Sequence, residues 1–142
     1  MKFKDYLDGR IRIYNCDCAD IMQEINSKSI DLILTDPPYG LRYDKKAHRD
    51  GGTKSRNAWA LKREYLDTDW DYLPEAKIFN EIIKISKNQI IFGAEHLCLM
   101  LPKSRGWLVW DKHTGENTFS DCELAWTSFD KPIKKYDFIW KG

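Results

Sequence analysis

The sequence has no apolar run long enough to cross a membrane, and it has almost no excess of charge of either sign. Its 23 lysines and arginines oppose 22 aspartates and glutamates, so the formal net charge is +1. A balance this close gives no sign, by itself, of a protein that binds nucleic acid. The absence of a membrane span and of a signal-peptide pattern predicts a cytoplasmic protein without membrane contact.

Cysteine and histidine are too few and too irregularly spaced to predict a metal site. Their spacings match none of the usual zinc patterns. We therefore expect no metal, reduced cysteines packed in a cytosolic core, and no catalytic role for the histidines. The residues concerned are Cys16, Cys18, Cys98, Cys122, His48, His96 and His113.

Residues 31–40 read Asp-Leu-Ile-Leu-Thr-Asp-Pro-Pro-Tyr-Gly and are the most informative stretch of the chain. The short apolar run before Asp36 is typical of a buried strand in a parallel sheet. Open sheets of that kind bind their ligands beyond the carboxyl ends of the strands. The pattern therefore predicts a functional loop made of Asp36, Pro37, Pro38 and Tyr39.

This tetrapeptide resembles the catalytic motif of the amino-group DNA methyltransferases, which methylate the exocyclic nitrogen of adenine or cytosine. The resemblance implies methylation of adenine, because an aspartate at the first position is the commoner choice of the adenine enzymes. It also implies S-adenosylmethionine as the methyl donor and double-stranded DNA as the partner. Asp36, Pro37, Pro38 and Tyr39 are then the candidate catalytic residues.

The chemistry of an amino group accounts for these residue types. An exocyclic nitrogen is a poor nucleophile because its lone pair is delocalised into the ring. Two acceptors aimed at its hydrogens, the Asp36 carboxylate and the Pro37 carbonyl, would stabilise the positive charge that develops on it. The prolines stiffen the loop, and Tyr39 offers a flat ring on which a base extruded from the duplex can stack.

By the same resemblance, the cofactor contacts are assigned to Asp17, Cys18, Thr35 and Asp36. A strand predicted at 10–16 places Asp17 at a carboxyl end, one strand away from Asp36. The Asp17 carboxylate would accept from the adenine amino group of the cofactor, and the next backbone N–H would donate to the ring. The alternative is that Asp17 only caps the short helix that follows it, and the two roles can coexist.

A basic connection follows the motif, and a second block of resemblance lies near the C-terminus. Residues 41–63 carry eight Lys or Arg and two Asp, a local charge of +6. This predicts a mobile loop that meets DNA phosphates or, alternatively, one that is solvated and meets nothing. Similarity around Trp110 and Glu123 implies that the loop 112–119 lines the target-base pocket, although it can equally be only a hairpin. The residues expected to bind nucleic acid are Arg42, Lys45, Lys46, Arg49, Lys54, Arg56, Asn117 and Phe119.

The order of strand and helix patterns predicts an α/β fold in a single domain over residues 1–142. A helix at 74–87 has apolar residues at helical spacing, and a strand follows at 89–93. The expected sheet is a partial Rossmann-like methyltransferase sheet, mostly parallel, with helices on both faces. Strands around Trp107 and Leu124 add an antiparallel hairpin near the C-terminus.

The Gly-rich loop that binds the cofactor in these enzymes has no counterpart here, because no Gly-x-Gly occurs in the sequence. We therefore expect the target-base half of a longer enzyme. Its missing C-terminal half, or a second copy in a homodimer, would cover an exposed sheet edge. One alternative is a non-catalytic fragment that binds DNA or a partner. Another is an RNA guanine amino-methyltransferase, although too few residues precede Asp36 to hold the cofactor loop that such enzymes place before the motif.

Overall fold

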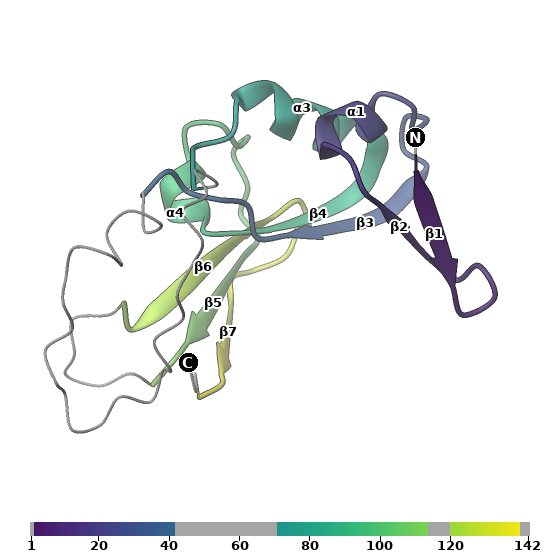
Figure 1. Ribbon diagram of the computed structural model, residues 1–142. Helices are drawn as coiled ribbons and strands as arrows, with labels where there is room; N and C mark the ends of the chain where they lie inside the picture. Colours follow the sequence, from purple (N-terminus) through teal and green to yellow (C-terminus); the bar gives the residue numbers. More distant parts are fainter. Residues whose placement is uncertain (1, 42–70, 114–119, 140–142) are drawn as a thin grey trace, which may run out of the picture.

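The computed structural model describes residues 2–41, 71–113 and 120–139, which form two β-sheets and three helices (Figure 1). The smaller sheet pairs β1 (Phe3–Tyr6) with β2 (Ile11–Tyr14). The larger sheet has the strand order β3-β4-β6-β5-β7. Its strands are β3 (Ile30–Thr35), β4 (Ser86–Phe92), β5 (Trp107–Asp111), β6 (Cys122–Thr127) and β7 (Lys134–Asp137). The helices are α1 (Cys18–Met22), α3 (Ala76–Ile85) and α4 (Ala94–Leu97).

The larger sheet is mixed, so the predicted partial Rossmann-like, mostly parallel sheet is wrong. β3 pairs parallel with β4, and β5 with β7, whereas β6 pairs antiparallel with both β4 and β5. Strands β5 and β6 do form an antiparallel pair near the C-terminus, but β6 inserts between β4 and β5. The connection from β5 to β6 is shorter than the crossover of a dozen or more residues that parallel neighbours need, so the two strands run in opposite directions.

The described helices all pack against one face of this sheet (Figure 1). Helices on both faces had been predicted. Helix α3 buries Phe79, Ile82 and Ile85 in one apolar cluster with Ile91 of β4 and Trp126 of β6. Helices α1 and α4 add side chains to the same cluster. Within the described ranges, none of the helices is long and apolar enough to span a membrane.

Helix α3 is shorter at both ends than the predicted helix 74–87, and a neighbouring turn fixes where it ends. The chain becomes extended at Ser86 (φ −116°, ψ 151°), where β4 begins. Lys28, in the turn before β3, donates its ammonium to the carbonyls of Ile83 at 2.7 Å and Ser86 at 3.0 Å. These bonds satisfy backbone carbonyls at the end of the helix. They also hold the start of β3 beside the start of β4.

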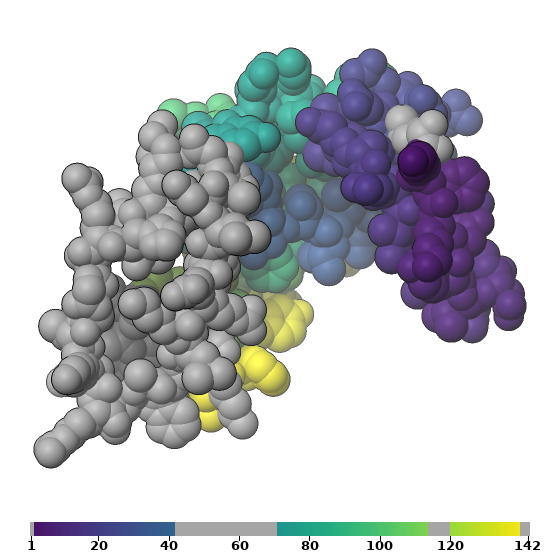
Figure 2. Space-filling model, in the orientation of Figure 1, coloured from purple at the N-terminus to yellow at the C-terminus, as the bar shows by residue number. Residues whose placement is uncertain are grey.

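Strands β1 and β2 form a hairpin apart from the larger sheet, so the strand predicted at 10–16 does not lie beside β3. Gly9, with φ 81°, lies in the turn between the two strands. Every residue of both strands is exposed, and Figure 2 shows the hairpin projecting from the rest of the described chain. The prediction that Asp17 follows a strand adjacent to that of Asp36 is therefore wrong.

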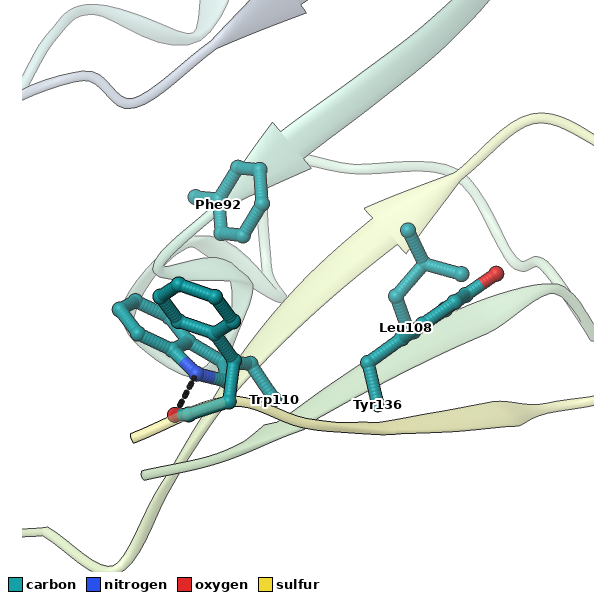
Figure 3. A pocket seen from close by; sticks show the side chains of 5 residues that line it. Phe92, Leu108, Trp110 and Tyr136 are labelled. Carbon is teal, nitrogen blue, oxygen red and sulfur yellow. Dashed lines mark hydrogen bonds between the residues drawn. The ribbon is translucent and has the colours of Figure 1, made fainter. Parts of the chain in front are cut away.

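The second face of the larger sheet carries apolar side chains that no described helix covers. Leu32 and Leu34 of β3 are 45% and 62% exposed. Farther along the same face lies an open hollow with a volume of about 300 Å³ (Figure 3). Its lining residues are Phe92, Leu108, Trp110, Tyr136 and Phe138. Apolar surface of this kind is typical of faces that make contacts.

Replacing Phe79 with alanine should lower the free energy of unfolding by about 3–5 kcal/mol, because the fully buried ring would leave a cavity. Urea denaturation followed by circular dichroism measures this loss. Leu99→Ala is the matched control: Leu99 is 97% exposed, so its loss should stay within about 0.5 kcal/mol. Equal losses in the two variants would contradict the described core.

Candidate functional site

The strand directions bring several loops of the larger sheet to one edge. β3, β4, β5 and β7 all end at this edge, and β6, which is antiparallel to its neighbours, begins there. Asp36 therefore follows β3 at the same edge where Gly93 follows β4, Lys112 follows β5 and Glu123 lies near the start of β6. Asp36 thus follows the carboxyl end of its strand as predicted, but in a mixed sheet and not in the mostly parallel sheet that had been expected.

Tyr39 connects the loop after β3 to the loop after β4. Its hydroxyl donates a hydrogen bond to Oδ1 of Asp36. Its ring centroid lies 5.1 Å from the ring centroid of His96 in α4, with 35° between the ring planes. A Cβ atom added to Gly93 would lie 1.8 Å from Cε1 of Tyr39, so the ring edge rests against this glycine. Two candidate catalytic residues, Asp36 and Tyr39, are therefore together, beside two residues to which the sequence analysis gave no role.

The far end of the motif loop contacts Asp71 and Leu73. Gly40 has φ 74°, and its N–H donates to Oδ1 of Asp71 at 3.0 Å. A Cβ atom at Gly40 would lie 3.0 Å from both Cβ and the backbone nitrogen of Leu73. Asp71 is only 6% exposed, which is unusual for a carboxylate. The sequence analysis missed this residue, because nothing in an acidic stretch predicts which carboxylate turns inward.

The phenol of Tyr39 keeps its proton more firmly than an ordinary tyrosine. Burial is the largest cause that raises the pKa of Tyr39, and the hydrogen bond to Asp36 is the second. The negative charges of Asp36, Glu123 and Glu95 raise this pKa further. Tyr39 is therefore a donor to Asp36 throughout the neutral pH range, and Glu95 and Glu123 lie close enough to act on it electrostatically.

Lys112 and Glu123 form an ion pair at this edge of the sheet. Nζ of Lys112 lies 2.7 Å from Oε1 of Glu123, and Lys112 is only 8% exposed. The ammonium also lies 6.0 Å from the ring centroid of Trp110, within the usual range of a cation–π contact. Lys112 thus links the end of β5 to the start of β6 within the described part of the block that carries the C-terminal resemblance.

The candidate cofactor residues are only partly brought together. Thr35 is the last residue of β3 and directly precedes Asp36. Asp17 caps α1 by accepting from the N–H of Ala19 at 2.8 Å, as the alternative reading of this residue proposed. Since β2 lies outside the larger sheet, pairing in that sheet does not bring Asp17 and Cys18 close to Asp36.

All of the residues predicted to bind nucleic acid lie outside the described residues. This holds for nearly all of the loop 41–63 and for Asn117 and Phe119. The basic positions concerned are Arg42, Lys45, Lys46, Arg49, Lys54 and Arg56. Among the described cysteines, Cys16, Cys18 and Cys98 are exposed, so the prediction that they pack in the core is wrong.

A second group of titratable side chains lies at the ends of β5 and β7. Asp111, His113 and Asp137 each offer a ligand atom, and these atoms lie within 4.8 Å of one another. The ammonium of Lys135 lies 2.9 Å from Asp111 and 3.0 Å from Asp137. Its hydrogen bond lowers the pKa of Asp111, with a smaller contribution from the N–H of His113. The protein's own lysine therefore already supplies the cation for these two carboxylates.

Asp71→Ala should release the end of the motif loop, because the N–H of Gly40 would lose its acceptor. We expect exchange of the Gly40 amide with solvent to accelerate by roughly tenfold or more, since a net hydrogen bond to a charged group is worth about 1.5–3 kcal/mol. Hydrogen exchange followed by NMR measures this change. Asp71→Asn keeps an acceptor oxygen and is the control, so similar acceleration in both variants would contradict the assigned role.

Tyr39 should remain protonated at pH values where ordinary tyrosines ionise. Absorbance at the phenolate band, followed through pH 10 and above, should contain one component that titrates late, since an unperturbed phenol has a pKa of about 10. Tyr39→Phe should remove that component and leave the others. A late component that persists in Tyr39→Phe, or its absence from the wild type, would show that Tyr39 is not held as described.

Comparison with known proteins adds no further assignment. The chain matches no protein family model, and it matches no curated protein sequence. The resemblance to amino-group methyltransferases therefore stays a prediction from the motif residues alone. A function for the chain has to be argued from those residues.

Proposed function

We propose that this chain is the target-base half of an S-adenosylmethionine-dependent methyltransferase that acts on the exocyclic amino group of adenine in DNA. One observation carries the proposal. The Asp36 carboxylate and the Tyr39 ring lie together in a proline-stiffened loop after β3, at the edge of the sheet where the loop after β4 also lies. An acceptor beside an aromatic surface is the arrangement that an extruded base with an amino group requires.

In this proposal Asp36 accepts one hydrogen of the target amino group, and the carbonyl of Pro37 accepts the other. Both interactions strengthen as positive charge develops on the nitrogen, so they favour the transition state over the bound substrate. A carboxylate has about four acceptor positions, so the bond from the Tyr39 hydroxyl leaves Asp36 able to accept from a base. The proton that the nitrogen loses passes to water.

S-adenosylmethionine would supply the methyl group, but the residues that the structure describes do not by themselves form a complete site for it. The Asp17 carboxylate is engaged in capping α1, and β2 does not join the larger sheet. The sequence also has no Gly-x-Gly loop for the methionine end. The proposed role of the described residues is therefore to bind and orient the base.

Asp36→Ala in the full-length gene product should reduce methylation of DNA by roughly 100- to 1,000-fold, because one well-placed polar group in a dry site is worth that much. Mass spectrometry of N6-methyladenine in digested DNA measures the loss, which should appear in kcat and not in KM. Asp130→Ala is the matched control, since Asp130 is 83% exposed in its side chain and pairs only with exposed Arg105 within the described chain. Near-normal turnover in Asp36→Ala would contradict the proposal.

The second candidate is a non-catalytic protein that binds DNA, and the absence of a Gly-x-Gly loop favours it. Isothermal titration of the full-length gene product with S-adenosylmethionine separates the two candidates. Binding of the methyl donor is expected for the methyltransferase. Binding of DNA without any binding of the methyl donor would favour the non-catalytic protein instead.

A further inference from the structure

The turn that follows β4 contacts the side chain of Tyr39, which comes from the loop after β3. β4 ends at Phe92, and Gly93 takes a left-handed conformation (φ 64°, ψ 26°) that begins α4. The first and last residues of this short helix, Ala94 and Leu97, are completely buried. Because the core fixes α4 through these two side chains, Gly93 and His96 occupy defined positions at the edge of the sheet.

The position of Gly93 favours glycine for two separate reasons. Its φ lies in the region that side chains disfavour. In addition, a Cβ atom here would lie 1.8 Å, 2.2 Å and 2.6 Å from Cε1, Cζ and Cδ1 of Tyr39. Three neighbouring ring atoms thus occupy the space of the missing side chain, so Tyr39 rests directly on the backbone.

His96 contacts the same ring. A centroid separation of 5.1 Å with a 35° tilt is within the range of a favourable aromatic pair. Together with the hydroxyl bond to Asp36, the contacts with Gly93 and His96 fix both the position and the tilt of the Tyr39 ring. None of these contacts lies within the motif loop itself except the one to Asp36.

We propose that Gly93 and His96 are positioning residues that hold the Tyr39 ring as the stacking surface for the target base. Gly93 does so by leaving room for the ring, and His96 by packing against it. The stacking of a base rests on the proposed function. The positioning of Tyr39 does not, because it can be measured in the 142-residue chain without DNA or a methyl donor.

The ionisation of Tyr39 reports its position, because burial of the ring is the main reason for its raised pKa. Carbon-13 NMR of labelled tyrosine, followed through a pH titration above the ordinary phenol pKa of about 10, gives the ionised fraction at each pH. His96→Ala should make Tyr39 ionise at lower pH than in the wild type, and His96→Phe, which keeps an aromatic ring, should leave the titration close to that of the wild type. His113→Ala is the control, because His113 lies with Asp111 and Asp137 at the ends of β5 and β7. An unchanged ionised fraction in His96→Ala would overturn the role of His96.

Gly93→Asn tests the glycine in the same measurement. Asparagine tolerates a left-handed conformation better than other side chains, so this variant adds atoms against Tyr39 with little backbone strain. We expect Tyr39 to be displaced and to ionise at lower pH, while circular dichroism remains that of the wild type. A folded Gly93→Asn protein with a wild-type Tyr39 titration would overturn the role of Gly93.

The outcomes for the two proposals are separable. If Asp36→Ala leaves DNA methylation intact, the proposed function fails, and the Tyr39 titrations still decide the positioning. If Asp36→Ala abolishes methylation but the His96 and Gly93 variants leave Tyr39 unchanged, the positioning inference fails and the proposed function stands.

Discussion

The parallel pairing of β3 with β4 is the interaction on which the rest of the candidate site depends. Its register places Thr35, the last residue of β3, opposite Ile91, one residue before the end of β4. The loop that carries Asp36 and Tyr39 therefore leaves the sheet beside the turn at Gly93. Helix α3 lies between the two strands in sequence, and its buried residues belong to the same hydrophobic cluster as Ile91. Contacts from Tyr39 to Gly93 and His96 follow from that alignment.

Local patterns predicted the local elements, and they failed where distant segments decide the arrangement. The apolar run before Asp36 and the helical spacing around Phe79 correspond to β3 and α3. The insertion of β6 between β4 and β5 depends on non-local pairing, which no sequence window contains. The same limit applies to β2, whose alternating residues match a sheet strand although it pairs only with β1 among the described residues. Periodicity gives the type of an element and not its partner.

The candidate site was only partly predictable, because some of its contacts join segments that are distant in sequence. Asp36 and Tyr39 are adjacent in a distinctive motif, so sequence alone selected them. Asp71 and His96 are distant from that motif in sequence and contact it only in the folded chain. The sequence around each of them contains no motif that would indicate this contact. Gly93 gave a weak signal, a glycine directly after a strand, which indicates a special backbone conformation but not the ring that rests on it. Supporting residues of a site are thus harder to predict than the residues that they support.

The central claim is that Tyr39 serves the proposed site through its ring and that its hydroxyl only orients it against Asp36. The most direct test compares Tyr39→Phe with Tyr39→Ala in the full-length gene product, by fluorescence titration with DNA that contains 2-aminopurine in place of adenine. Tyr39→Ala should weaken binding of the base by roughly 1–3 kcal/mol, the usual worth of one stacked base, whereas Tyr39→Phe should lose far less. Equal losses in the two variants would contradict the claim and would require a direct role for the hydroxyl.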